Sequence, residues 1–500
     1  MSWLGIFIDR AEITGLLTDD SGRCLARDSL PLTCVPGAQG QDEQDPADWW
    51  AATVALIDAL QEADAGALTA VRGIGLAGHG EGPVLLDGQG RVLCPVPLGG
   101  AAMAAGEGAL AASLARLRAR DPARLAQLAL ILTPKDYLRH RLADDLARVA
   151  GAARAEGAPG AVTDPASASE WHLLDPAGRN WCPQALARAE LTAAQLPALR
   201  DATRPVARLS DLLRRRWGMR QAVTLGTGCG ETAALATGLG LVAPGQGVLS
   251  LSGTGWVLVA DGAEPAQPLP GLRCLRHALP RRWLHMGAVP MAGDSLAWLG
   301  RAAGSYPTDL TRLAQQGFRG PGAELFLPPP APQPFASPLP GPGAAAAPAL
   351  APAAAFVGLA GHSDLPRLAQ AVLEGVACAL RELCDRLRAN GVRLERMQVI
   401  GAGAQSRLWV EILATQLRLD LCLPAAGVFG AALGAARLAQ LSVSGVAPPV
   451  ICTAPPVLDR VMPMSDHGAA YEAQYRRFRA VTDQLRGTLP GDGAAPGGGA

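Results

Sequence analysis

The chain carries VLSLSGTG at Val248–Gly255 and VIGAGAQS at Val399–Ser406, the two stretches on which its fold assignment depends. Each is an apolar run of strand length that ends in a turn of glycine and other small residues. The second turn also precedes a helical pattern, for which Ser406 is a suitable N-cap. Backbone N–H groups and the helix dipole favour an anion at such a turn, whereas the same residues are also typical of a plain packing corner.

A repeated order of strands and helices surrounds these two stretches. In the second half of the chain we expect three strands, a long helix and a further strand at 248–252, 256–260, 283–289, 365–387 and 397–401. In the first half the same order is expected at 3–8, 13–18, 24–32, 48–63 and 71–78. Two copies of one βββαβ unit predict a duplicated α/β fold, with two lobes and a cleft between them.

The length of 500 residues favours two large domains. We place an N-terminal lobe at 1–243, a C-terminal lobe at 244–486 and a glycine-rich, disordered tail at 487–500. Outside the repeated units, 114–148 and 183–220 have mainly helical patterns. The proline- and alanine-rich stretch 321–352 is expected to be a loop.

The charge balance bounds the possible partners. Forty-four basic and 44 acidic residues give a formal net charge of zero, so no overall field steers nucleic acid or an anionic membrane to the protein. The first apolar run is short and is followed at once by Asp9 and Arg10, unlike a signal peptide or a membrane span. We therefore expect a cytoplasmic protein with a small-molecule partner.

Five further segments follow one another in a characteristic order. They are EQDPADWW at 43–50, LTPKDYLRHRL at 132–142, HALPRRW at 277–283, AVLEGVA at 371–377 and GAALGAARLAQ at 430–440. Together with the two glycine turns, they resemble the FGGY carbohydrate kinases, and most of all the xylulokinase branch, from about Trp3 to Leu485. The resemblance implies a two-lobed, actin-like ATPase fold of the ribonuclease H-like type. It also implies that the lobes close on ATP, Mg²⁺ and a sugar.

The resemblance implies a nucleotide site on the C-terminal lobe. The second phosphate loop corresponds to Gly253, Thr254 and Gly255, for which an ordinary hairpin turn is the alternative. The adenosine end is implied at Gly401, Ala402, Gly403, Ala404, Gln405 and Ser406.

The first phosphate loop departs from the family pattern. The family has an aspartate-rich hairpin with Gly-Thr after its first strand, and here Phe7, Ile8, Asp9, Arg10 and Ala11 stand in its place. Phe7 cannot hold a metal-bound water, which leaves Asp9 as the candidate carboxylate toward Mg²⁺. The alternative is that Asp9 only ends a strand.

Glu231 is the candidate catalytic residue. It lies in GTGCGETAA at 226–234, a segment that resembles the one bearing the family's catalytic aspartate, which takes the proton of the sugar hydroxyl. A glutamate is a competent general base, but its carboxylate lies one methylene further from the backbone. The alternative is that Glu231 is an acidic residue in the first turn of a helix, where acids are favoured.

The sugar pocket departs most from the family. The xylulokinase branch has a Gln-Met-His-Gly turn where this chain has His79, Gly80, Glu81 and Gly82. It has a Trp-Asn-Asp-x-Arg run where this chain has only small or apolar residues at 99–103. His79, Gly80 and Glu81 are therefore the candidate substrate-binding residues, with a solvated surface loop as the alternative. Sugar specificity depends on buried hydrogen-bonding groups, so the preferred sugar is left open.

Lys135 and Asp136 are interpreted as structural residues. Lys135 is the only lysine of the chain. We expect the two charges to pair locally or to cap the helix that follows them, because such positions favour acids and hydrogen-bonding side chains.

Three functional hypotheses follow. The first is ATP-dependent phosphorylation of a small sugar or polyol, with Glu231 as the base. The second is a catalytically impaired pseudokinase that binds nucleotide or another ligand without chemistry. The third is a different enzyme on the same fold, such as a nucleotide hydrolase, for which the sequence offers no separate base or metal ligands. Whether the chain catalyses a reaction, and its oligomeric state, stay open at this point.

Overall fold

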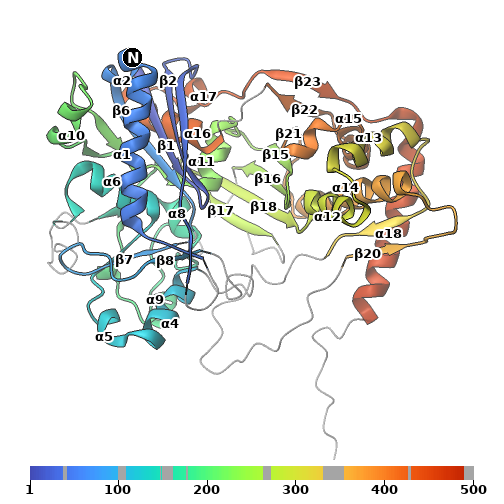
Figure 1. Ribbon diagram of the computed structural model, residues 1–500, viewed down its shortest axis with the longest axis horizontal. Helices are drawn as coiled ribbons and strands as arrows, with labels where there is room; N and C mark the ends of the chain where they lie inside the picture. Colours follow the sequence, from blue (N-terminus) through green and yellow to red (C-terminus); the bar gives the residue numbers. More distant parts are fainter. Residues whose placement is uncertain are drawn as a thin grey trace, which may run out of the picture.

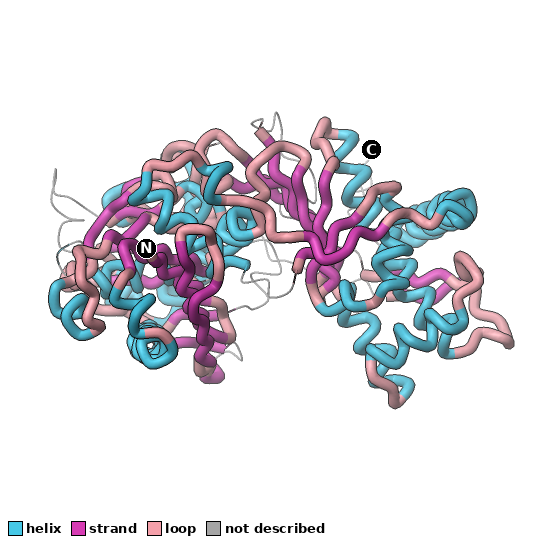
Figure 2. The backbone as a smooth tube through the Cα atoms, turned by 90° about the horizontal axis from the view of Figure 1, so that it is seen from above, coloured by secondary structure: helices cyan, strands magenta, loops and turns pink. Residues whose placement is uncertain are grey.

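The structure, a computed structural model, describes residues 1–37, 42–80, 82–98, 109–146, 148, 161–175, 178–262, 272–329, 354–425 and 430–488. The described residues form two α/β lobes side by side, with the N-terminal strands in one lobe and the strands that follow Gly245 in the other (Figure 1). The strands of the second sheet lie at the centre of the molecule, with helices on the side away from the first lobe (Figure 2).

The first lobe is built on a seven-stranded mixed sheet. Its order is β12 (Pro205–Arg208), β13 (Thr224–Gly226), β6 (Val71–Gly78), β1 (Ser2–Ile8), β2 (Glu12–Asp19) and β3 (Cys24–Pro31), with β14 (Cys229–Gly230) also paired to β6. The pairs β1/β2 and β2/β3 are antiparallel, and β1/β6 is parallel. Smaller sheets join β4 (Val35–Pro36), β5 (Asp42–Gln44) and β8 (Val96–Leu98), then β7 (Val84–Leu86) with β9 (Leu130–Leu132), and β10 (Val162–Thr163) with β11 (Ala198–Leu199).

Helices cover this sheet and fill the lower part of the lobe. They are α1 (Pro46–Ala63), α2 (Ala65–Thr69), α4 (Ala109–Arg120), α5 (Pro122–Leu125), α6 (Pro134–Ala143), α8 (Pro165–Ser169), α9 (Pro183–Arg188), α10 (Asp211–Arg216) and α11 (Glu231–Gly238). Helix α1 shows why they begin where they do. The Asp45 side chain accepts a hydrogen bond from the Ala47 N–H, and Pro46 occupies the first turn. Its buried face packs on the sheet through Trp49, Leu56, Ile57 and Leu60.

The second lobe repeats this plan. Its sheet has the order β17 (Arg273–Arg276), β18 (Trp283–Val289), β16 (Gly255–Asp261), β15 (Gln246–Leu251), β21 (Arg396–Ile400), β22 (Leu421–Pro424) and β23 (Val457–Val461). The long helix α14 (Leu365–Ala389) connects to β21, which pairs in parallel with β15. The predicted βββαβ duplication is therefore confirmed, with β1, β2, β3, α1 and β6 corresponding to β15, β16, β18, α14 and β21.

The remaining elements of the second lobe are mostly helical. They are α12 (Ala292–Ala303), α13 (Pro307–Gly317), β19 (Leu325–Leu327), β20 (Ala355–Val357), α15 (Arg407–Leu417), α16 (Gly430–Ser444), α17 (Pro448–Ile451) and α18 (Gly468–Thr488). Alternate residues of β15 and β16 pack on opposite faces of the sheet. Leu249 and Val257 join the core with α12, α14 and α15, whereas Val248 and Leu258 face a second core shared with the first lobe.

Helix α16 packs on the first lobe although its sequence lies between β22 and β23 of the second. A Cβ on Gly5 would lie 2.0 Å from the Ala432 carbonyl oxygen, and a Cβ on Gly75 would lie 1.9 Å from that of Ala435. Helices α11 and α16 meet in the same way, since a Cβ on Gly434 would lie 1.9 Å from the Ala234 carbonyl oxygen. Only glycine allows the main chains to approach so closely. The two lobes thus share a continuous core, and the division at 243/244 stays a prediction.

Three sequence expectations need correction. The stretch predicted as mainly helical at 183–220 also contributes β11 and β12, and β9 interrupts the helices of 114–148. These short strands are paired by partners distant in the sequence, which local patterns do not reveal. Strand β19 lies within the predicted loop 321–352, most of which is outside the described residues. Helix α18 extends through Thr488, two residues into the predicted tail, whose remaining residues are not described.

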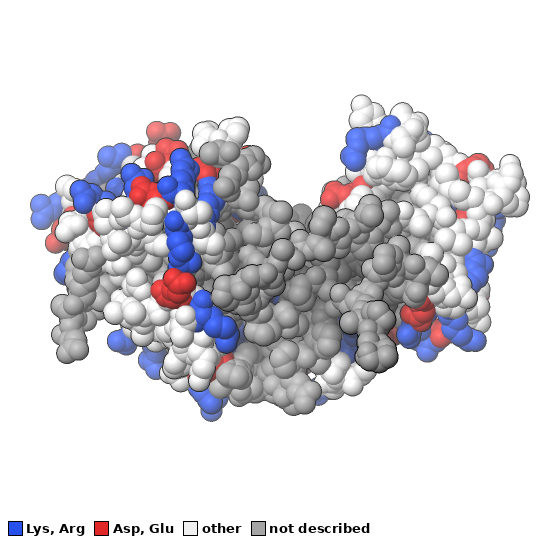
Figure 3. Space-filling view, turned by 90° about the horizontal axis from the view of Figure 1, so that it is seen from below, with Lys and Arg blue, Asp and Glu red and all other residues white. Residues whose placement is uncertain are grey.

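Across the described residues, none of the helices has both the length and the apolar character that a bilayer span requires. Basic and acidic side chains are interspersed on the face shown in Figure 3, in keeping with the zero net charge. The outline of the molecule is indented between the two lobes in this view. This is the position in which the duplicated fold predicts a cleft.

We expect Gly75→Ala to destabilise the protein by at least roughly 1–3 kcal/mol, because the new methyl group meets the main chain of α16 and neither element can move alone. The midpoint of urea unfolding measures the effect. Gly468→Ala is the matched control, since no atom lies within 4 Å of its Cβ position. Equal stability of the two variants would contradict the close packing of α16 on β6.

Candidate active site

Three candidate residues follow directly on neighbouring strands of the first lobe. Ile8 pairs with Gly78 across β1 and β6, and Gly78 pairs with Gly230 across β6 and β14, all in parallel. Asp9, His79 and Glu231 are the next residues on these three strands. Adjacent strands are about 4.8 Å apart, so the backbones of Asp9 and Glu231 are separated by roughly 10 Å. The tertiary structure therefore brings both candidate carboxylates to one edge of the sheet.

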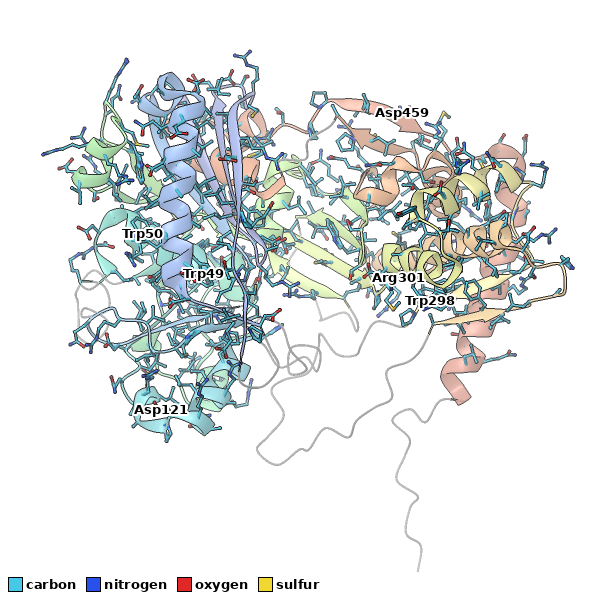
Figure 4. The ribbon with its side chains drawn as sticks, in the orientation of Figure 1. Trp49, Trp50, Asp121, Trp298, Arg301 and Asp459 are labelled. Atoms are coloured by element: carbon cyan, nitrogen blue, oxygen red, sulfur yellow. The ribbon has the colours of Figure 1, made fainter. Side chains whose placement is uncertain are left out.

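Asp9 lies in the tight turn between β1 and β2. Its N–H donates to the Glu12 carbonyl at 2.9 Å, and its carboxylate accepts from the Arg10 N–H at 2.6 Å. The buried Gln44 supports this turn, because its amide donates to the Arg10 carbonyl at 2.8 Å while its oxygen accepts from the Trp49 indole at 2.9 Å. Trp49 lies toward the N-terminal end of α1 (Figure 4). Sequence reasoning did not single out Gln44 as the residue that fixes this turn.

Glu231 is the first residue of α11 and is half-buried. It follows β14 through Gly230, which is the N-cap of the helix and makes no side-chain cap. Two features hold the preceding turn. Gly228 has φ +70° and presses on the Leu76 backbone, and the Thr227 carbonyl accepts from Lys135 and Arg139. Glu231 is therefore a first-turn acid of a helix, as the structural interpretation has it, and its role as a base stays a prediction.

A buried network of four charged side chains contacts the turn that precedes Glu231. Lys135 Nζ lies 2.7 Å from Asp136 Oδ1 and 3.1 Å from Asp164 Oδ1, and Arg139 Nη1 lies 2.5 Å from Asp136 Oδ1. All four side chains are buried. Thr133 caps α6 through the Asp136 N–H, and Asp164 caps α8 by accepting from the Ala166 and Ser167 N–H groups. The expected structural role of Lys135 and Asp136 agrees with this geometry.

The pKa of Asp136 follows from this network. Burial by itself would raise the pKa of the carboxyl group. The charges of Lys135 and Arg139, together with hydrogen bonds from Lys135 and Thr133, outweigh burial and lower the pKa to about 2. Asp136 is therefore ionised across the neutral range and holds both cations in place.

In the second lobe, the two glycine turns follow neighbouring parallel strands. Ser250 of β15 pairs with Ile400 of β21, so the turns lie at one sheet edge. A Cβ on Gly401, which has φ +93°, would lie 2.6 Å from Ser252 Oγ, and one on Gly403 would lie 2.7 Å from the Leu251 Cβ. Ser406 caps α15, as predicted, by accepting from the Trp409 N–H.

These contacts assign different positions to the predicted nucleotide-binding residues. Gly403 and Gly255 are buried between elements of the lobe, and so have a packing role. The other seven are exposed or half-buried along the outer side of the two turns. They are Gly253, Thr254, Gly401, Ala402, Ala404, Gln405 and Ser406. The packing-corner interpretation therefore holds for Gly255 and Gly403, and ligand binding by the other residues stays a prediction.

Asp294, which sequence reasoning did not select, adjoins the first of these turns. The N–H groups of Gly293 and Asp294 donate to the Ser252 and Gly253 carbonyls at 2.8 and 3.2 Å. The Asp294 carboxylate is exposed, and a Cβ on Gly253 would lie 2.8 Å from its Oδ1. The start of α12 therefore fixes the Gly253–Gly255 turn through its main chain.

The substrate-binding candidates of the first lobe lie in different surroundings. His79 is buried, with its ring edge-on to Trp49 at 6.2 Å between centroids. Gly80 is also buried and adjoins Glu170 at the end of α8. The solvated-loop alternative is therefore wrong for these two residues. Glu81 lies outside the described residues, as do residues 99–103.

The side chains near the two strand ends can be compared with those that a magnesium ion requires. Within the described ranges, no three His, Cys, Asp or Glu side chains gather as metal ligands. Magnesium in nucleotide sites commonly takes only one or two carboxylates, completed by phosphate oxygens and water. Asp9 and Glu231 supply carboxylates of this kind at one sheet edge, whereas Phe7 packs against the core shared by the lobes. The residues present fit an ion that arrives with a nucleotide.

Comparison with known proteins gives concordant results along most of the chain. Profiles of the FGGY family of carbohydrate kinases match residues 102–238 (N-terminal domain) and 248–443 (C-terminal domain). Xylulose kinase of Escherichia coli (strain K12) is 29% identical, over 97% of this chain and 99% of that protein. A solved xyloylose kinase from Brucella ovis has a TM-score of 0.87 at 29% identity, over 97% of this chain and all of that one. Xylulose kinase from Rhodospirillum rubrum, at 22% identity and a TM-score of 0.83, shares the fold.

We expect stability to fall as the pH decreases from about 4 to about 2. The folded pKa of Asp136 lies below its unfolded value, so its contribution is complete above the unfolded pKa and is lost as pH approaches the folded pKa. A shift of this size corresponds to roughly 2 kcal/mol. Urea unfolding of wild type and Asp136→Asn across this range measures the contribution. The stability difference between them should shrink toward pH 2, and a constant difference would contradict the assignment.

Proposed function

The chain belongs to the FGGY family of carbohydrate kinases, and from this premise we propose that it transfers the γ-phosphoryl group of ATP to a hydroxyl of a small sugar or polyol. The observation that carries the proposal is the position of Glu231. It lies at the edge where β1, β6 and β14 end, in the segment that corresponds to the family's catalytic one. The actin-like, two-lobed architecture accompanies the family assignment.

In the proposed reaction Glu231 accepts the proton of the attacking hydroxyl. A general base contributes by holding a carboxylate within hydrogen-bonding reach of that proton. Lys135 and Arg139 act indirectly, because both donate to the Thr227 carbonyl and so set the turn that presents Glu231. Phosphoryl transfer depends mainly on positioning and charge stabilisation, so a firmly held turn matters more than any covalent step.

The nucleotide is proposed to bind along the outer side of the turns at Gly253–Gly255 and Gly401–Ser406. Backbone N–H groups and the Thr254 hydroxyl are donors suited to phosphate oxygens. A magnesium ion bound with ATP would neutralise charge that develops on the phosphates, and Asp9 is the proposed carboxylate toward it. The acceptor would bind in the first lobe, where β6 and β14 end, beside Glu231 and Gly80.

We expect ADP to bind the protein with a stoichiometry of one, because the turns at Gly253–Gly255 and Gly401–Ser406 follow two paired parallel strands and so form a single candidate site. Isothermal titration calorimetry measures this binding. Gly253→Val should abolish it, since the branched side chain collides with the Asp294 carboxylate and displaces the turn. Gly468→Ala, remote from any neighbouring atom, should leave it unchanged. No binding of millimolar ADP to folded protein would contradict the proposed function.

We expect Glu231→Gln to lower sugar-dependent ADP release at least about 100-fold, because the amide cannot accept the proton, while ADP affinity stays unchanged. Glu231→Asp should raise activity if the shorter side chain improves the reach of the carboxylate. A coupled ADP-release assay over ketoses, aldoses and polyols measures both. Glu62→Gln on the exposed side of α1 is the control.

Two results would contradict this role of Glu231. Unchanged turnover in both variants would show that the base lies elsewhere. Binding of ADP without turnover of any acceptor, in wild type and variants alike, would show that the chain is a nucleotide-binding module rather than a kinase.

A further inference from the structure

A second glutamate, Glu170, lies against Gly230, the residue that precedes the proposed base. Glu170 ends α8, and its side chain spans the glycines at the ends of two strands. A Cβ on Gly80 would lie 1.7 Å from Glu170 Oε2, and a Cβ on Gly230 would lie 2.8 Å from Oε1. Gly80 follows β6 and Gly230 directly precedes Glu231. The carboxylate therefore occupies the space that side chains at both strand ends would otherwise fill.

The position of Glu170 is fixed by the network that also fixes Glu231. Asp164 caps the start of α8 and lies 3.1 Å from Lys135 Nζ. The Glu170 N–H donates to the Ser167 carbonyl at 3.2 Å, and a Cβ on Gly230 would lie 3.5 Å from the Ser167 Cα. Lys135 thus contacts both the start of α8 and the Thr227 carbonyl. The two glutamates are held by one rigid unit rather than by independent loops.

Glu170 is half-buried, so part of its side chain is open to solvent at the end of β6 and β14. A carboxylate accepts hydrogen bonds from hydroxyl groups but cannot donate one when ionised. Carboxylates of the protein repel the carboxylate of an acidic ligand, and the repulsion is strong in a partly desolvated site. Placing like charges together therefore disfavours binding of that ligand. Uncharged hydroxyl groups carry no such penalty.

We propose that Glu170 determines the acceptor class: beside Glu231 it selects uncharged polyols and sugars and excludes sugar acids. The assignment rests on the proposed function, because it places the acceptor at the edge formed by β6 and β14. Glu170 acts through repulsion of a carboxylated acceptor as well as through hydrogen bonds to hydroxyl groups. Glu231 keeps its role as the base.

The test compares polyols with sugar acids of equal carbon number. Calorimetry in the presence of ADP measures the dissociation constants of xylitol against D-xylonate and of D-glucitol against D-gluconate. In the wild type each polyol should bind at least about tenfold more tightly than its acid. Glu170→Gln keeps the shape and removes the charge, so it should lower the dissociation constant of the acids at least about tenfold and change that of the polyols little. Glu62→Gln should alter neither.

A second pair of variants tests the geometry without a ligand. Gly80→Ala should lower the melting temperature, because its methyl group collides with the Glu170 carboxylate. Glu170→Ala in the same chain should restore it, so the two changes are coupled. Additive effects would overturn the contact between these residues.

Each result of the binding test is decisive. Equal polyol-to-acid ratios in wild type and Glu170→Gln overturn the selection by Glu170, and so does the absence of binding by both members of every pair. Neither of these results contradicts the proposed function, provided that ADP binds and that any acceptor is phosphorylated. Failure of ADP binding, by contrast, removes the proposed function itself.

Discussion

Main-chain contact between α16 and the first lobe is the constraint on which the arrangement of both lobes depends. The Ala432 and Ala435 carbonyls of α16 occupy the spaces beside Gly5 and Gly75, and Gly434 meets the main chain of α11. Close approach of this kind leaves no room for adjustment, because interiors are packed as densely as organic crystals. The core that α16 completes includes Ala77 and Cys229 from the first lobe and Val248 and Leu258 from the second. The strand ends that carry the candidate site are anchored to this shared core.

The buried charges of Lys135, Asp136, Arg139 and Asp164 have a comparable role inside the first lobe. Removing four charges from water is costly unless they are paired and hydrogen-bonded, as they are here with Thr133, Thr163 and the Thr227 carbonyl. Loss of one partner would leave an uncompensated buried charge, so the four side chains depend on one another. Together they hold the turn before Glu231 and the start of α8, whose C-cap is Glu170, so a single network positions both carboxylates of the proposed acceptor site.

The two lobes use their glycine turns differently. In the second lobe, Gly401 and Gly403 allow two turns to pack against each other, which leaves Thr254, Ala402 and Gln405 on the outer side. In the first lobe, Gly80 and Gly230 make room for a side chain from a distant helix. The first arrangement suits phosphate groups, which bind backbone donors. The second suits an acceptor whose hydroxyl groups meet carboxylates.

The sequence by itself determined the duplicated strands and helices, because apolar periodicity and capping residues such as Asp45 and Ser406 act locally. It also indicated the glycine turns, the structural role of Lys135 and the position of Glu231 at a helix start. The tertiary structure decided which strand ends adjoin, that His79 turns toward Trp49, and that α16 returns to the first lobe. It also decided that Glu170 lies over Gly80, a contact between residues 90 positions apart. Such contacts depend on how whole elements pack, and a glycine that admits a distant side chain has the same local pattern as one that only forms a turn.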